Sequence, residues 1–221
     1  IPNPQIGLRL LLARTLWLAG YPDQALKASY ESLAIARAEN HPYSEASILH
    51  TVTMIHQFRR EAAQVQEQAA AAAGLLTAHG FTWLLTSLTI LEGWALIELA
   101  QPVTGIARSS QGLADYRASG STNKLSNFLA ILSEGYLALG QTQAGLTLLA
   151  EALDWINQTD ERWWEAEVYR LQGELLHRQG EPLITVEACF ERSIALAQRQ
   201  QAKSLELRAT NSLCKLWQAQ G

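Results

Sequence analysis

Three charged residues in the C-terminal half of the chain have the spacing of a single helix face. Glu167, Arg170 and Glu174 are three and four positions apart, so a helix would place their side chains on one stripe. The planar guanidinium of Arg170 could donate paired hydrogen bonds to a carboxylate or a phosphate. The spacing therefore fits the charged wall of a binding pocket. It also fits a structural network between adjacent helices, or an ordinary solvated helix face.

The other residues of chemical interest do not suggest a catalytic arrangement. His50 and His56 are six positions apart, which places them on different faces of a helix, unlike the paired histidines of an i, i+4 metal site. Cys189 and Cys214 lie in apolar helical patterns, so we expect buried and unreactive thiols. The sequence contains no Gly-x-x-x-x-Gly-Lys-[Ser/Thr] phosphate loop. We therefore expect no enzyme activity, cofactor or metal in this segment.

Composition describes a folded chain without a strong charge. Of 221 residues, 48% are hydrophobic and 17% are charged, and the net charge is −4. This balance is typical of a folded protein, and it gives no basic field that would hold a nucleic-acid backbone. Charged or polar residues interrupt every apolar stretch before the length of about 20 residues that spans a bilayer. We expect a cytoplasmic protein with neither nucleic acid nor membrane as a partner.

The elements that must position these residues are helices. Ala, Leu, Gln and Glu dominate between Gly and Pro breaks, with apolar residues every three or four positions, and no alternating β-branched stretch competes. The pattern predicts helix pairs at roughly 6–20 with 22–40, 43–57 with 60–79, 82–100 with 102–118, 123–139 with 141–157, and 161–179 with 184–200, and a last helix at about 203–220 without a partner.

Small residues recur at the start of the second helix of each pair. Aligning Ala25, Ala63, Gly105, Gly145 and Ala188 gives intervals of 38, 42, 40 and 43 residues. The tetratricopeptide repeat (TPR) has a period of 34, so these intervals predict the same hairpin with longer helices. The fold class expected is all-α, a right-handed superhelical solenoid of TPR-like hairpins with a period of about 40 residues. Small residues on the first helices would allow close helix contact there: Ala13, Gly93, Ser133, Gly173 and Cys214.

Several phrases of the sequence resemble a known family. They include WLAGYPDQAL from Trp17 to Leu26, RWWEAEVYRLQGELL from Arg162 to Leu176, and the final stretch from Ala197 to Gly221. They resemble the C-terminal TPR region of large bacterial signalling proteins. Those proteins carry a class III adenylate/guanylate cyclase domain, or in some relatives a DNA-binding domain, followed by a STAND-type AAA ATPase. The resemblance covers essentially the whole chain, and it implies one repeat domain over 1–221 within a larger protein.

The resemblance implies a regulatory scaffold. We expect it to bind a protein or peptide segment, with the parent protein's own ATPase domain as one candidate partner. The alternative is a sensor that binds a small-molecule inducer in the concave groove. A homodimer through the C-terminal end is a further expectation, because Leu213, Leu216 and Trp217 of the unpaired last helix would be left partly uncovered.

In a TPR solenoid the first helices line the concave groove. Their register places two tryptophans, Trp17 and Trp94, toward the groove, whereas Trp155 and Trp217 are expected to pack between helices. For any one of these tryptophans, packing in the core is the alternative to a role in recognition. The full set of predicted groove or binding residues is Arg14, Trp17, His56, Trp94, Glu98, Glu134, Glu167, Arg170, Glu174 and Arg178.

Overall fold

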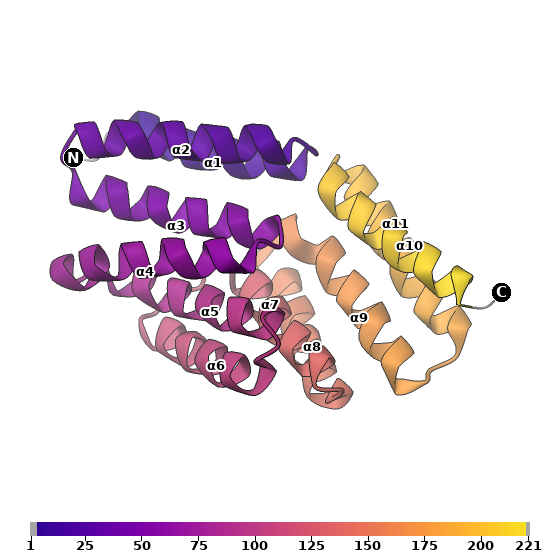
Figure 1. The fold of residues 1–221 in the computed structure, drawn as a ribbon. Helices are drawn as coiled ribbons and strands as arrows, with labels where there is room; N and C mark the ends of the chain where they lie inside the picture. Colours follow the sequence, from indigo (N-terminus) through magenta and orange to yellow (C-terminus); the bar gives the residue numbers. More distant parts are fainter. Residues whose placement is uncertain (1–3, 220–221) are drawn as a thin grey trace. The chain divides into compact units, whose positions relative to one another are not determined.

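The computed structural model describes residues 4–219, and within this range the chain contains eleven α-helices and one short 3₁₀ helix, with no strand (Figure 1). The all-α fold expected from the sequence is therefore confirmed. The chain divides into two compact units, of which the first ends at Thr122 and the second begins at Asn123. Each unit is described separately below.

The first unit consists of three antiparallel helical hairpins. α1 packs on α2, α3 on α4 and α5 on α6, and the first helices α1, α3 and α5 also contact one another in chain order. Because α3 touches α1, α2, α4 and α5, its residues from Ala46 to Phe58 are all buried. The helices are α1 (Pro4–Leu18), α2 (Pro22–Ala38), α3 (Pro42–Phe58), α4 (Ala62–His79), α5 (Thr82–Glu98) and α6 (Pro102–Ala118).

The second unit continues the same pattern. α7 pairs with α8 and α9 with α10, while α11 packs on both α9 and α10. The first helices of the repeats again contact one another, α7 with α9 and α9 with α11. The elements are α7 (Leu125–Ala138), α8 (Thr142–Thr159), the 3₁₀ helix η1 (Arg162–Trp164), α9 (Glu165–Gln179), α10 (Leu183–Arg199) and α11 (Lys203–Gln218).

The predicted helix boundaries agree with the structure to within two residues, with one exception. The predicted start of the helix at 161 falls just before η1, and regular α-helix begins only at Glu165. The predicted end of the last helix at 220 lies outside the described residues. Within those residues, no helix combines the length and the apolar character needed to cross a membrane.

The repeat is more regular than the small residues suggested. The second helices begin at Pro22, Ala62, Pro102, Thr142 and Leu183, which gives a period of 40 residues for three steps and 41 for the last. A residue with positive φ, mostly Gly or a polar residue, follows each helix of this array from α1 to α10, because a left-handed residue ends a helix and satisfies its last carbonyl groups. These residues are Gly20, Asn40, Arg60, Gly80, Ala100, Gly120, Gly140, Asp160, Gly180 and Gln201.

Three of the small residues predicted to lie at helix contacts do not lie there. Ala63 and Ala188 are exposed, and the buried positions at the start of α4 and α10 are instead Val65 and Val186. Cys214 is also exposed, whereas the sequence suggested a buried thiol, because the apolar face of α11 is turned one position away, at Leu213. A branched side chain fills the contact as well as a small one wherever the helices stand farther apart.

Gly93 and Gly105, by contrast, mark a real close approach. A Cβ atom built on Gly105 would lie 2.5 Å from the carbonyl oxygen of Gly93 and 2.6 Å from Cγ1 of Ile97. Only glycine therefore fits where α5 crosses α6. In the second unit, Gly173 faces the ring of Phe190 on α10 in the same manner, with 2.6 Å between the added Cβ and Cε1.

Candidate functional site

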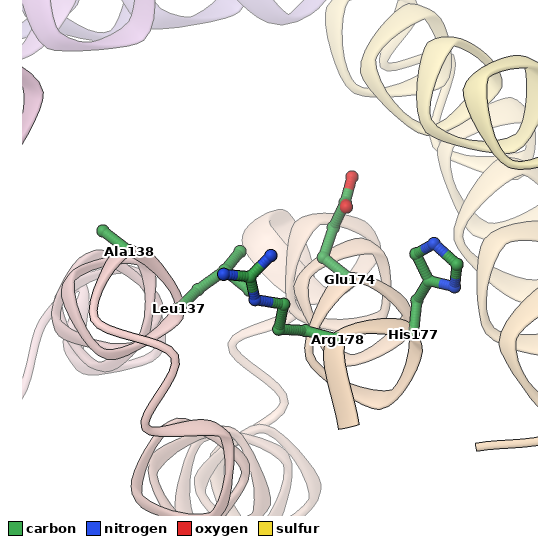
Figure 2. Close-up of a pocket in the computed structure, with 5 residues that line it drawn as sticks. All are labelled: Leu137, Ala138, Glu174, His177 and Arg178. Atoms are coloured by element: carbon green, nitrogen blue, oxygen red, sulfur yellow. The ribbon is translucent and has the colours of Figure 1, made fainter. Parts of the chain in front are cut away.

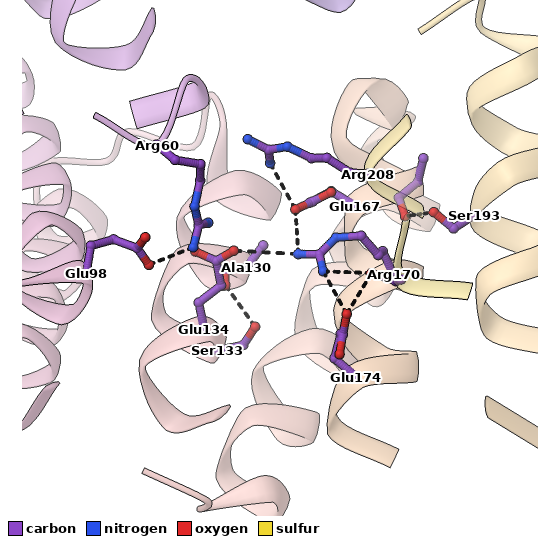
Figure 3. Close-up of polar contacts among 12 residues, drawn as sticks. Arg60, Glu98, Ala130, Ser133, Glu134, Glu167, Arg170, Glu174, Ser193 and Arg208 are labelled. Atoms are coloured by element: carbon purple, nitrogen blue, oxygen red, sulfur yellow. Dashed lines mark hydrogen bonds and ion pairs between the residues drawn. The ribbon is translucent and has the colours of Figure 1, made fainter. Parts of the chain in front are cut away.

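Four of the predicted site residues meet in the second unit, where α9 lies beside α7 (Figure 3). Arg170 on α9 donates a hydrogen bond from Nη2 to Oε1 of Glu167 at 2.8 Å and one from Nη1 to Oε1 of Glu174 at 3.3 Å. The same Nη2 lies 3.6 Å from Oε1 of Glu134 on α7. One guanidinium is thus shared by three carboxylates from two neighbouring first helices.

Helix α11 extends this network through two residues. Arg208 donates to Oε1 of Glu167 at 3.0 Å, and the hydroxyl of Ser212 donates to Oε1 of Glu174 at 2.6 Å. Nη1 of Arg170 also lies 3.4 Å from Oγ of Ser212. The network therefore connects α7, α9 and α11. We call these six residues, Glu134, Glu167, Arg170, Glu174, Arg208 and Ser212, the charged staple.

Most of this network is shielded from solvent, and this determines the charge of Arg170. The side chain of Glu167 is only 2% exposed, and Arg170 is nearly buried as well. Burial alone would lower the pKa of Arg170, but the attraction of Glu167, Glu134 and Glu174 outweighs it and raises that pKa. Arg170 is therefore a permanent cation. Among the readings left open by the sequence, a solvated helix face is excluded, and the network does tie adjacent repeats together.

A pocket opens at the end of the staple, between the C-terminal turns of α7 and α9 (Figure 2). Its volume is about 640 Å³, and its wall consists of Leu137 and Ala138 on α7 with Glu174, His177 and Arg178 on α9. Glu174 belongs both to the staple and to the pocket, so the staple fixes one wall. The apolar and charged sides of the pocket face each other across it, as in many small-molecule sites.

Two basic residues of the pocket make no polar contact within the described part of the protein. Among the residues that the structure describes, Arg178 and His177 have no hydrogen bond and no ion pair, and both are exposed. Glu174 and Arg178 have the i, i+4 spacing that normally favours a salt bridge. Instead, Oε1 of Glu174 is turned toward Ser212 and Arg170.

In the first unit, His56 occupies a second polar cluster rather than an open groove. It is buried, its Nδ1 lies 2.6 Å from Oε2 of Glu61, and its Nε2 lies 2.9 Å from the hydroxyl of Tyr30. Arg59 donates to Glu61 and to Asp23, both at 2.8 Å. Burial opposes ionisation of Glu61, but the hydrogen bonds from His56 and Arg59 prevail and lower the pKa of this carboxyl group.

Two tryptophans placed toward the groove by their register pack in the core instead, as the alternative interpretation expects. Trp17 and Trp94 are buried, because Trp17 packs on the ring of Phe58 at 4.6 Å and the guanidinium of Arg60 covers the ring of Trp94 at 5.3 Å. Arg60 also donates to Glu98 at 2.6 Å (Figure 3). Trp217 does not pack between helices, since half of its surface is exposed, which agrees with the expectation that it is left partly uncovered. Leu213 and Leu216, which were expected to be uncovered with it, are buried instead.

Arg14 belongs to neither cluster. It is half-buried on α1, and burial lowers its pKa. The ten predicted residues therefore do not form one site. Glu134, Glu167, Arg170, Glu174 and Arg178 lie together in the second unit, whereas Arg14, Trp17, His56, Trp94 and Glu98 belong to the first.

Sequence reasoning missed Arg208, Ser212, Tyr30 and Glu61. A usable signal existed for the first two, because contacts between first helices join residues about one repeat apart. Ser212 follows its partner Glu174 by 38 positions, and Arg208 follows its partner Glu167 by 41. Opposite charges at this spacing indicate a tie between repeats. Within the described residues no three His, Cys, Asp or Glu side chains are grouped as a metal site would require.

Comparison with known proteins supports the fold. No family model matches the chain. An uncharacterized protein, R02095 of Rhizobium meliloti (strain 1021), is 26% identical over 205 residues, which are 93% of this chain. The chain spans about a fifth of that relative, since the match covers 20% of its length.

Two solved structures of TPR-like repeats are also similar. Both are of the nearly identical TPR-like repeats of a putative kinesin light chain from Podosopora anserina. One has a TM-score of 0.55 at 14% identity over 89% of this chain and 96% of that one. The other has a TM-score of 0.53 at 16% identity over 97% and 98%. The chain therefore has the fold of a TPR-like helical-repeat protein.

Proposed function

We propose that this chain is a non-catalytic scaffold that docks a protein segment on the exposed face of α11. The observation that carries the proposal is the exposure of two large apolar side chains there, Leu207 at 61% and Trp217 at 50%. Their positions fall within about a quarter of a turn around the helix axis. Exposed tryptophans are frequent anchors of protein interfaces.

The helix that carries these anchors is held rigidly on its other side. Arg208 and Ser212 join α11 to the charged staple, and Leu205, Ala209 and Leu216 are buried beneath it. The indole Nε1–H of Trp217 donates to Glu187 at 2.8 Å, which fixes the orientation of the ring. A preorganised anchor loses little conformational entropy when a partner binds, which favours affinity.

The partner that we propose is the ATPase domain of the same polypeptide. Two observations support it: the resemblance to the repeat regions of bacterial cyclase and ATPase signalling proteins, and the small share of the Rhizobium relative that this chain spans. In this function the repeats, in the cytoplasm, would restrain or release the ATPase. Pairing of α11 with a second copy of the chain is the competing use of the same face.

The proposal is tested by measuring how tightly the chain binds the purified protein segment encoded immediately upstream in its reading frame. We expect Trp217→Ala to weaken this binding at least about tenfold. Val103→Ala in the first unit is the matched control, because Val103 is 70% exposed and distant in sequence, and it should leave the affinity unchanged. Equal affinities of wild type and Trp217→Ala, or light scattering that shows only a self-paired dimer, would contradict the proposal.

A sensor function is the alternative, and the pocket between α7 and α9 specifically favours it. Its volume of about 640 Å³ is within the usual range for small-molecule sites, and it presents unused charged groups beside an apolar wall. A ligand there would contact α9, the central helix of the charged staple. Ligand binding and partner docking would then be coupled through α9 and α11.

A further inference from the structure

We propose that the pocket between α7 and α9 binds a small zwitterion, a free α-amino acid, with its carboxylate on Arg178 and its ammonium group on Glu174. This inference rests on the sensor function described above and names its ligand class. It does not depend on docking at α11. Three features of the pocket support it: the position of the two charges, the hydrogen bonds that hold Glu174, and the apolar character of the opposite wall.

Arg178 offers its guanidinium to a ligand. Its guanidinium has no partner among the described residues, although Glu174 stands one turn away on the same helix at a spacing that usually forms a salt bridge. In Figure 2 the guanidinium reaches over the pocket between Leu137 and Glu174. A planar guanidinium with all its donors available matches a carboxylate in a bidentate manner. His177 on the same wall can add a further donor.

Glu174 is held in place through one of its two carboxylate oxygens. Oε1 of this residue accepts from Ser212 at 2.6 Å and from Arg170 at 3.3 Å, so the carboxylate is fixed. Its other oxygen has no hydrogen bond within the described part of the chain, and 31% of the side chain is exposed. Arg170 divides its attraction among three carboxylates, of which Glu174 is the most accessible. Oε2 of Glu174 therefore remains available as an acceptor for an ammonium group.

The charges of Glu174 and Arg178 do not neutralise each other. The staple draws Glu174 toward α11, so it does not neutralise Arg178, and the pocket keeps a positive and a negative group side by side. A ligand with one charge satisfies only one of them, whereas a zwitterion satisfies both. Leu137 and Ala138 form the opposite wall, which suits an aliphatic side chain. Removal of either ligand charge leaves one of the two protein charges without its partner, which lowers the affinity.

Isothermal titration calorimetry on the complete chain tests the inference. The probes are the twenty common L-amino acids, with L-leucine as the lead probe because of the aliphatic wall. For each amino acid that binds, its amide and its N-acetyl form are titrated as well. We expect at least one amino acid to bind and both of its derivatives to bind at least about tenfold more weakly, since each lacks one of the two charges.

Variants locate the binding. Arg178→Ala should weaken binding at least about tenfold. Arg199→Ala is the matched control, because Arg199 is an exposed arginine in the last turn of α10, and it should bind as wild type does. Ala138→Trp fills the pocket from an exposed position on α7 and leaves every residue of the staple in place, and it should abolish binding. Circular dichroism of each variant shows that it is folded.

Three results would overturn the inference: no saturable binding by any amino acid up to about 10 mM, equal binding of the charged and capped forms, or wild-type binding by Arg178→Ala. The docking assay with the upstream segment is run on the same protein. If docking persists while amino acids fail to bind, the inference fails and the scaffold proposal stands. If amino acids bind but Trp217→Ala does not affect docking, the scaffold proposal fails and the inference stands.

Discussion

At the scale of single residues, the two polar clusters show how this helical array accommodates charge in its interior. His56 in the first unit is buried and Arg170 in the second is nearly buried, and nearby carboxylates bind both of them. A buried polar group without such partners would cost about 1 to 3 kcal/mol. The carboxylates are therefore the residues whose removal should be felt most, and their ionisation links stability to pH.

Glu61→Gln should lower stability at neutral pH and lose this effect in acid. The pKa of Glu61 is lowered below its ordinary value of 4.5 in the folded chain, so its ionised form stabilises the protein above that pH. The contribution disappears as pH falls through the lower folded-state pKa. Urea unfolding at several pH values should show a loss of about 1 kcal/mol at pH 7 and a much smaller loss in acid, at a pH below the folded-state pKa of Glu61. Glu31→Gln, in an exposed pair with Lys27, should show almost no effect at either pH.

The residue scale is also where the sequence was least informative. The stripe of Glu167, Arg170 and Glu174 could be predicted, because the i, i+3 and i+7 spacing lies within one helix. The exposure of Trp17, Trp94 and Trp217 could not, because it depends on how far each first helix rotates against the next. Apolar periodicity defines a face to within about one residue, or 100°, and this is enough to exchange a groove position for a core position.

At the scale of elements, helix boundaries were predictable and helix contacts only partly. Gly, Pro and polar breaks recur every 20 residues, and each break coincides with a left-handed residue that ends a helix. Gly93 and Gly105 were correctly read as a close contact, since glycine in a strong helix needs a reason. The prediction that Ala63 and Ala188 lie at contacts was wrong, because alanine is common on exposed helix surfaces as well as at contacts.

Gly105→Ala should destabilise the first unit strongly, whereas Gly74→Ala should stabilise it. The Cβ of an alanine at 105 would press on the backbone of Gly93 and Ile97 at 2.5 to 2.9 Å, so α5 and α6 must move apart. We expect a loss of about 3 kcal/mol. Gly74 is inside α4, exposed, with nothing within 4 Å of an added Cβ, so alanine should add about 0.5 to 1 kcal/mol.

Thermal unfolding measures both changes as opposite shifts of the midpoint. The pair is informative because both residues are glycines in helix interiors and receive the same methyl group. Helix propensity alone predicts that both substitutions stabilise. If Gly105→Ala raised the midpoint as Gly74→Ala does, the close crossing of α5 and α6 would be wrong.

At the scale of the whole molecule, the polar clusters act locally along a repeat array. In such arrays stability is approximately a sum of repeat terms and nearest-neighbour contacts, so each contact protects mainly the helices that it joins. The charged staple joins three successive first helices, α7, α9 and α11, within the second unit. Binding of the proposed ligand to Arg178 and Glu174 would be coupled to partner docking on α11 through these contacts.

Arg208→Ala should therefore loosen α11 selectively. It removes the hydrogen bond at 3.0 Å from α11 to the buried Glu167, and it uncovers the ring of Trp164, over which the guanidinium lies at 6.0 Å. Weakening a buried charged contact by about 1.4 kcal/mol corresponds to a tenfold change in the opening equilibrium. Amide hydrogen exchange should accordingly accelerate about tenfold in α11, with little change in α7 and α8. Lys215→Ala is the matched control, since Lys215 is an exposed cation on the same helix without a hydrogen bond or ion pair in the described chain. Equal exchange in α11 of the two variants would show that the staple does not hold this helix, and an acceleration spread evenly over α7 to α11 would show that the second unit opens as one block.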